Sequence, residues 1–218
     1  MSHRRSQFIL GSRSPHRLQL LRHVVDPQLI EVLPARSAEE AGFAGLNDWA
    51  ALEQRLKQIV REKYSDVLEQ RQYALNDGEV VITADTIIVI SESDDRLAVL
   101  RQPPNDDTWP QTVRRWFRQY YAGRTHVAVT ALCVATSVGE QVERVVKSEV
   151  TFRPDVNRWL DWYISTNEPR GKAGGYAIQG LGSVFVSHVQ GSLSNVVGLP
   201  LEELLNVFKD LGISVSNN

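Results

Sequence analysis

The chain has 218 residues, a hydrophobic fraction of 42% and a charged fraction of 23%, values that are ordinary for a soluble globular protein. This length suits one large domain or two small lobes around a cleft. The formal net charge of -2 argues against a broad surface for nucleic acid or membrane, although 24 Lys and Arg residues leave room for a local basic pocket that binds a small anion.

Cysteine content and hydropathy suggest a cellular location. Cys133 is the one cysteine, so no disulfide can form within the chain, and we expect it to be a small core residue in a reducing cytosol. No apolar stretch is long enough to cross a bilayer, and the apolar run Phe8-Ile9-Leu10 is too short for a signal peptide. We therefore expect a cytoplasmic protein without a membrane partner.

The first predicted unit is a strand over residues 8–10, followed by a polar loop and a helix. Ser14 is placed to cap this helix, with Pro15 at its first position, where the missing N–H costs nothing. The hydroxyl groups of Ser12 and Ser14, together with Arg17, would suit an anion at the helix start. An ordinary capped helix with solvated arginines explains the same residues.

A second strand is predicted over residues 29–33, and a polar loop with Glu39 and Glu40 follows it. Adjacent acids in a loop are usually solvated. Residues 49–67 have the pattern of an amphipathic helix. Its apolar face consists of Leu52, Leu56, Ile59, Val60 and Val67. Lys63 lies on this helix between charged neighbours, and a solvent-facing lysine is the default interpretation.

Residues 80–90 are rich in β-branched side chains and predict a buried strand, yet Asp85 stands in its middle. An ionised carboxylate without a partner in an apolar layer is energetically costly. Asp85 must therefore be paired, bind a cation, or lie where the strand opens into a cleft. A structural aspartate at a strand bend or bulge is the alternative to a catalytic or metal-binding role.

A short strand is predicted over residues 97–100 and a helix over 112–121, with Asn105 or Asp106 as its cap and Gly123 at its end. The helix carries an aromatic cluster that we assign to the core or to a subunit interface: Trp116, Phe117, Tyr120 and Tyr121.

The C-terminal half alternates strands and helices. We expect an antiparallel hairpin, a helix, a glycine-rich loop, a strand and a last helix, over residues 126–152, 155–165, 171–180, 184–189 and 202–211. The apolar side of the first of these helices is expected to hold Val156, Trp159, Leu160 and Tyr163. The glycine-rich loop is not a Walker loop, since no helix pattern or Lys-Ser/Thr pair follows it. Together these elements predict an α/β domain with an elongated mixed sheet.

Four segments in order resemble the Maf family of nucleoside triphosphate pyrophosphatases. The opening Leu10–Arg17 resembles the family's Ser-x-Ser-Pro-Arg-Arg loop, and Ala84-Asp85-Thr86 its Ala-Asp-Thr segment. Residues 171–180 and 195–201 resemble its closing block. The likeness runs from about Phe8 to about Phe208, so it treats residues 1–218 as a single Maf-like domain.

The resemblance implies a two-lobed α/β fold like that of inosine triphosphatases, with the active site in a central cleft. It implies hydrolysis of a nucleoside triphosphate to the monophosphate and pyrophosphate, helped by a divalent cation such as Mg²⁺ or Mn²⁺, which oxygen ligands suit. It also implies a homodimer, for which the aromatic cluster of residues 116–121 offers an apolar patch.

The resemblance also assigns residues. Asp85 matches the general base and, with Glu40 or Glu39, the metal position; a carboxylate that binds a cation can orient a water for attack. The positions expected to contact substrate are Ser12, Ser14, His16, Arg17, Lys63, Thr86, Arg101, Gln102, Lys172 and Gln179. Thr86 and Gln179 match positions that distinguish the base, and Gln179 matches the branch that prefers dTTP and UTP over 7-methyl-GTP.

Two positions depart from the family pattern. His16 stands where the family has arginine, and Gln102 stands before Pro103 where it commonly has lysine; Arg101 is the neighbouring cation. Both changes remove positive charge from a polyanion site. A nucleotide-binding regulatory protein with weak or no turnover is therefore the alternative function, and release of pyrophosphate separates the two.

Overall fold

The computed structural model describes residues 6–36, 42–93 and 96–215. Seven strands are present in this part of the chain: β1 (Gln7–Leu10), β2 (Ile30–Val32), β3 (Glu79–Ser93), β4 (Arg96–Leu100), β5 (Thr125–Thr136), β6 (Gln141–Phe152) and β7 (Val186–Gln190). The α-helices are α1 (Pro15–Leu21), α2 (Trp49–Gln70), α3 (Trp109–Trp116), α4 (Asn157–Ser165), α5 (Leu193–Val197) and α6 (Leu201–Asp210). A π-helical turn, Phe117–Tyr121, continues α3, and short 3₁₀ turns cover Pro27–Leu29, Ala173–Gly175 and Leu181–Phe185.

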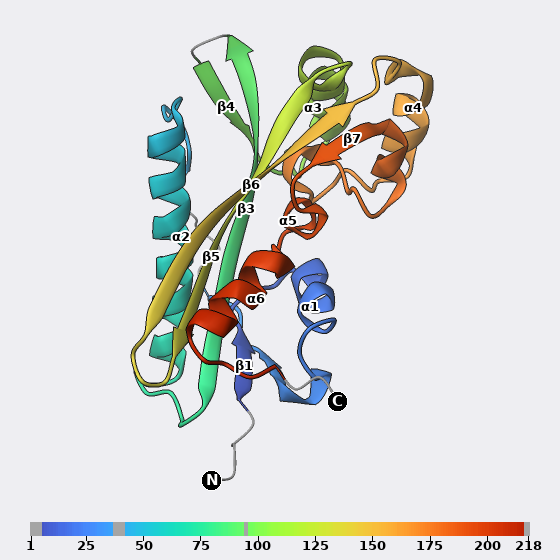
Figure 1. The fold of residues 1–218 in the computed structure, drawn as a ribbon. Coiled ribbons are helices and arrows are strands. Elements are labelled where there is room, and N and C mark those ends of the chain that lie inside the picture. Colours follow the sequence, from blue (N-terminus) through green and yellow to red (C-terminus); the bar gives the residue numbers. More distant parts are fainter. Residues whose placement is uncertain (1–5, 37–41, 94–95, 216–218) are drawn as a thin grey trace.

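All strands form one mixed sheet in the order β2-β1-β3-β5-β6-β7, with β4 also paired to β3. One edge of β3 pairs antiparallel with β5 from Val80 to Val89. The other edge is shared: β1 pairs parallel with β3 as far as Ile82, and β4 pairs antiparallel from Ile88 onward. Between them, residues 83–87 have no strand partner on this edge among the described strands. Figure 1 shows β1 and β4 at opposite ends of the long β3.

The sheet is covered on both faces, and the alternation of side chains along β3 decides which residue meets which layer. Val80, Ile82 and Ala84 join the core under α1 and α6. Ile87 and Val89 join the core under α2. Figure 1 shows α2 along one face of the sheet and α1, α5 and α6 on the other. The expected α/β architecture with an elongated mixed sheet is therefore confirmed.

The end of the sheet near β4, at the top of Figure 1, has its own aromatic core, which we call the upper core. It is shared by β5, β6, α3, α4 and the turns that follow these helices. Trp116, Phe117 and Tyr121 are at most 8% exposed and pack inside it. Three of the four aromatic side chains are therefore part of the core, and Tyr120 is partly buried against them, so the cluster does not form the exposed apolar patch that was expected for a dimer.

Most predicted elements are confirmed, including the buried face of α2, all five members of which are at most 1% exposed. Three details are wrong. The cap of α3 is Thr108, whose N–H donates to Asp106. Trp159 is 45% exposed, so it lies outside the apolar face of α4. Residues 193–197, where no helix was expected because residues 191–195 read as a loop, form α5, which Ser192 caps by accepting from the N–H of Asn195.

No helix in the described parts of the chain combines the length and the apolar character that crossing a bilayer would require.

The upper core buries His126, which is 1% exposed, and burial lowers its pKa to about 3. The unfolded chain binds a proton at His126 more readily than the folded one, so its contribution to stability is lost as pH falls from 6.5 to about 3. The loss amounts to about 5 kcal/mol at most.

We predict that the melting temperature falls less from about pH 7 to about pH 4 in His126→Gln than in the wild type. Exposed His188→Gln is the control, and equal acid sensitivity of wild type and His126→Gln would contradict the assignment.

Candidate active site

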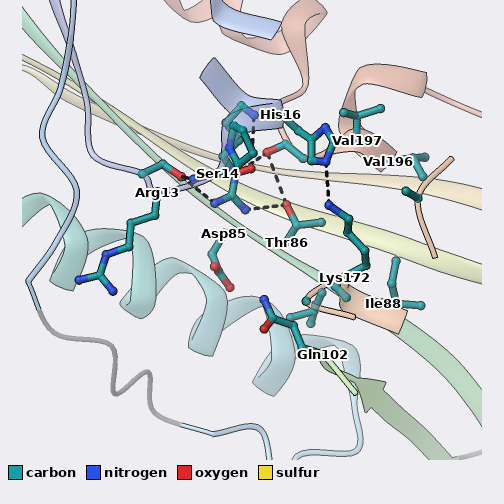
Figure 2. A pocket seen from close by; sticks show the side chains of 18 of the residues that line it. Arg13, Ser14, His16, Asp85, Thr86, Ile88, Gln102, Lys172, Val196 and Val197 are labelled. Carbon is teal, nitrogen blue, oxygen red and sulfur yellow. Dashed lines mark hydrogen bonds between the residues drawn. The ribbon is translucent and has the colours of Figure 1, made fainter. Parts of the chain in front are cut away.

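A cavity of about 770 Å³ opens at the unpaired stretch of β3, between the two ends of the sheet. Such a volume is typical of a small-molecule site. It is lined by β3 and α2, by the loop before α1, by the segment after β4, by the glycine-rich loop and by the turn after α5. Figure 2 shows Asp85 and Thr86 of β3 in this cavity, with His16 and Lys172 meeting close to Thr86. The open edge of β3 therefore joins both faces in one cavity.

Asp85 lies on the α2 face of this open edge and is 8% exposed. Lys63 donates from Nζ to Oδ1 of Asp85 over 2.6 Å, and the lysine side chain is only 16% exposed. Lys63 is therefore a partly buried ion-pair partner and not the solvent-facing lysine that its helical position suggested. The pair satisfies the requirement that a carboxylate in this strand must have a partner.

Arg17 lies on the other face of β3, and three acceptors fix its guanidinium plane. Nε donates to the Gly198 carbonyl over 2.8 Å, Nη1 to Ser12 Oγ over 3.1 Å and Nη2 to Thr86 Oγ1 over 3.1 Å. Ser14 caps α1 by accepting from the Arg17 backbone N–H, as predicted. A rigid guanidinium fork that faces a cavity is well suited to phosphate oxygens.

His16 and Lys172 approach each other across the cavity, from α1 and from the glycine-rich loop. His16 Nε2 and Lys172 Nζ are 2.9 Å apart, and Figure 2 shows this contact as a dashed line. Burial and the nearby Lys172 charge lower the pKa of His16 below its usual 6.5, against a smaller opposing effect of Glu168. His16 is therefore neutral at pH 7 and accepts from the lysine.

The remaining predicted residues lie toward the outer part of the cavity. Arg101, Gln102 and Gln179 all line it and are exposed to solvent. Neighbouring Arg101 and Gln102 both reach the cavity because they follow the end of β4, where strand alternation no longer separates them. The expected metal ligands Glu39 and Glu40 lie outside the described residues, and no group of three or more His, Cys, Asp or Glu side chains within the described ranges could hold a metal.

Sequence reasoning missed several groups that organise the cavity. The Gly198 carbonyl fixes Arg17, and Thr130 Oγ1 lies 2.9 Å from Thr86 Oγ1. Thr130 in turn donates to the Asn195 carbonyl, and Asn195 is fully buried with its amide donating to Ala128 and Ser148. For Thr130, the one available signal in the sequence was a lone threonine in an apolar strand. The carbonyls of Gly198 and Asn195 belong to the backbone, so no side chain in the sequence could indicate their role.

The charges that line the cavity are unbalanced. Of the described lining residues, five are cationic and one is a carboxylate: Arg13, Arg17, Lys63, Arg101 and Lys172 against Asp85. Such a cavity attracts polyanions, since partial exclusion of water strengthens each charge interaction.

Comparison with known proteins identifies a family. The family model described as "Maf-like protein" matches residues 7–211. The "dTTP/UTP pyrophosphatase" of Anaeromyxobacter dehalogenans strain 2CP-1 is 34% identical over 209 residues, which cover 94% of each chain. The protein of the same name from Syntrophus aciditrophicus is 33% identical over 94% of this chain and 90% of its own. The "Nucleoside triphosphate pyrophosphatase" of Neorickettsia sennetsu is 32% identical over 95% of this chain and 90% of its own.

A solved structure of a nucleoside-triphosphatase / dITP/XTP pyrophosphatase from Mycobacterium abscessus aligns with 96% of this chain and 100% of its own, at 15% identity and a TM-score of 0.42. That likeness is too weak to inform the site. The family model and the sequence relatives, in contrast, each cover most of the chain, and the chain therefore belongs to the Maf family.

Proposed function

We propose that this protein hydrolyses nucleoside triphosphates to the nucleoside monophosphate and pyrophosphate. The observation that carries the proposal is the position of one paired carboxylate, Asp85, in a cavity whose other charged side chains, among the described lining residues, are all cationic. The names of the family relatives, dTTP/UTP pyrophosphatase and nucleoside triphosphate pyrophosphatase, support the same activity. Release of pyrophosphate from a panel of triphosphates is the direct test.

The geometry supports division of labour between the two faces of β3. Arg17 and Lys172 would bind the phosphates and stabilise the charge that builds up on the leaving pyrophosphate. Asp85 would accept a proton from the water that attacks the α-phosphorus, as the bond from that phosphorus to the bridging oxygen breaks. Lys63 orients the carboxylate for this role by holding its Oδ1.

We propose Mg²⁺ or Mn²⁺ as the cofactor. The donor chemistry fits, because Asp85 offers a carboxylate in the cavity and the substrate phosphates bring further oxygens, the ligands that these cations prefer. Asp85 would hold the cation together with Glu40 or Glu39, which lie outside the described residues. When bound, the cation would neutralise phosphate charge and so lower the cost of bringing a polyanion beside Asp85.

For the base we propose thymine or uracil. Gln179 lines the cavity, and its amide offers one donor and one acceptor group to the edge of a pyrimidine. Thr86 also lines the cavity, but its hydroxyl binds Arg17 and Thr130, so its contribution to base choice acts through the position of Arg17. The names of the dTTP/UTP pyrophosphatase relatives agree with this preference.

We also propose that the protein acts in the cytoplasm, in keeping with its single, buried cysteine.

We propose a homodimer, which the family resemblance implies. Sedimentation velocity at micromolar concentration should give the mass of two chains. A monomer at these concentrations would contradict the dimer.

Because the aromatic cluster is internal, Trp116→Leu should lower the melting temperature of the protein.

Asp85→Asn should abolish most of the activity while retaining the fold. Asparagine has similar size but cannot accept the proton, so we expect kcat to fall roughly 10²-fold or more, the scale of a general base. Circular dichroism and melting temperature would verify folding, and exposed Asp107→Asn is the matched control. Near-normal turnover by a folded Asp85→Asn protein would rule out the base assignment.

Wild-type kcat/KM should be higher for dTTP and UTP than for CTP and 7-methyl-GTP. Gln179→Glu should shift the ratio of 7-methyl-GTP to dTTP upward by about tenfold, the scale of one or two hydrogen bonds, because a carboxylate only accepts. Gln190→Glu adds the same charge on β7, away from the cavity, and should leave the ratio unchanged. If 7-methyl-GTP is the best wild-type substrate, the role given to Gln179 is wrong.

His16→Arg should raise kcat/KM for dTTP and UTP already at pH 7 as well as above it, because the lowered pKa leaves the imidazole neutral there and arginine brings a fixed charge beside the phosphates. In the ligand-free protein the new charge would face Lys172, so the melting temperature should fall, and inorganic tripolyphosphate should then stabilise the variant more than the wild type. His23→Arg, in the exposed turn after α1, is the control. Unchanged kinetics in His16→Arg would show that His16 does not contact the phosphates.

A further inference from the structure

The glycine-rich loop brings Lys172 and Gln179 to the cavity with little regular structure of its own. Its Gly171, Gly174 and Gly175 all have positive φ, and one 3₁₀ turn is its only helical segment. Repeating backbone hydrogen bonds therefore do not set the shape of this loop. Anchors outside it must do so, since a shift of about 1 Å in a substrate-binding group is enough to impair catalysis.

Two tyrosines of the aromatic core supply such anchors. The hydroxyl of Tyr121 donates to the Gly174 carbonyl over 2.9 Å, and the Gly174 N–H donates to the Arg101 carbonyl over 3.0 Å. A β-carbon at Gly174 would collide with the Tyr121 hydroxyl and with Ile88, so the backbone lies directly against the core. This first anchor fixes the part of the loop near Lys172.

Tyr176 is the second anchor and lies three residues before Gln179, the residue assigned to the base. Its side chain is 6% exposed and points into the core, where its ring meets the edges of Tyr121, His126 and Phe152. Its hydroxyl lies 2.8 Å from His126 Nε2. Tyr176 itself and the next residues along the chain, Ala177, Ile178 and Gln179, line the cavity.

His126 has no evident role apart from this bond. Burial lowers its pKa to about 3, so it stays neutral and does not exchange protons at working pH. Its Nδ1 is buried without a hydrogen-bond partner among the described residues. Its ring neighbours are Tyr121, Phe152 and Tyr176, among which a phenylalanine would pack without burying an unpaired nitrogen.

We propose that His126 is a positioning residue for base recognition: its hydrogen bond to Tyr176 fixes the depth of that side chain in the core and thereby the place of Gln179 in the cavity. A buried polar pair in an apolar core can specify one arrangement at a cost in stability. The proposal rests on the proposed function, since it deepens the assignment of Gln179 to the base. It links a residue on β5 to substrate choice without contact between them.

The experiment separates stability from selectivity. In Tyr176→Phe the bond is lost and His126 is left buried without a partner, so both the melting temperature and the ratio of kcat/KM for dTTP to that for dCTP should fall. We expect the ratio to fall about three- to tenfold, the scale of one neutral hydrogen bond. In the double variant His126→Phe/Tyr176→Phe both partners are apolar, so the melting temperature should recover while the ratio stays low.

Two further variants complete the test. His126→Gln, which can still bond the Tyr176 hydroxyl, should retain most of the ratio. Phe208→Leu loosens the separate core under α6, where Phe208 packs on Phe8, and should lower the melting temperature with no change in the ratio. If the ratio recovers with stability in the double variant, or if Tyr176→Phe leaves the ratio unchanged, the pair has only a structural role and the proposal is overturned.

The outcome for the proposed function is read separately, from pyrophosphate release by the wild type. If the wild type binds nucleotides without turnover, hydrolysis is refuted. The same variants are then compared by calorimetry, with the ratio of the dissociation constants of dCTP and dTTP in place of the kinetic ratio. The same fall in Tyr176→Phe and the same failure to recover in the double variant are expected.

Discussion

The ion pair of Asp85 and Lys63 at the open edge of β3 is the interaction on which the cavity depends. A carboxylate that is 8% exposed in an apolar strand must have a partner, and α2 provides it because the helix runs along the face of the sheet toward which Asp85 points. The unpaired stretch of β3 makes the same carboxylate accessible, since β1 ends before it and β4 begins after it. Burial and access are thus combined at one residue by the topology of the sheet.

The alternation of a β-strand distributes the chemistry between the two layers. Asp85 meets Lys63 on the α2 face, while its neighbour Thr86 meets Arg17 on the opposite face. Adjacent residues can contribute to one site only where the strand has an open edge around which the cavity can extend. A one-residue shift in the register of β3 would exchange these partners, so the long pairing with β5 from Val80 to Val89 protects the site as well as the fold.

Local pattern explains why much of the fold was predictable from the sequence. The near-continuous β-branched run of β3 and the helical period of the apolar face of α2 are both local signals, and both elements appear where expected. The five-residue α5 was missed because a helix this short has no period to detect. The site is different, since its pairs join distant parts of the chain: Arg17 with Gly198, and His16 with Lys172. Lys63 looked solvated because nothing local reveals a partner 22 residues away. The family resemblance placed these residues in one site, and the structure supplies the contacts among them.

The excess of positive charge in the cavity has a consequence for how the ligand-free protein is built. Like charges repel, so the cations are kept apart by separate supports: Lys63 by Asp85, Arg17 by three neutral oxygens, and Lys172 by the neutral imidazole of His16. The neutral state of His16 matters here, because a second charge 2.9 Å from Lys172 would oppose the contact that joins the two sides of the cavity. A polyanion that enters between these groups relieves the repulsion among them. In the proposed function, part of the affinity for a triphosphate would come from relief of this repulsion, and a neutral residue at position 16 would limit the repulsion while supplying one charge fewer to the phosphates.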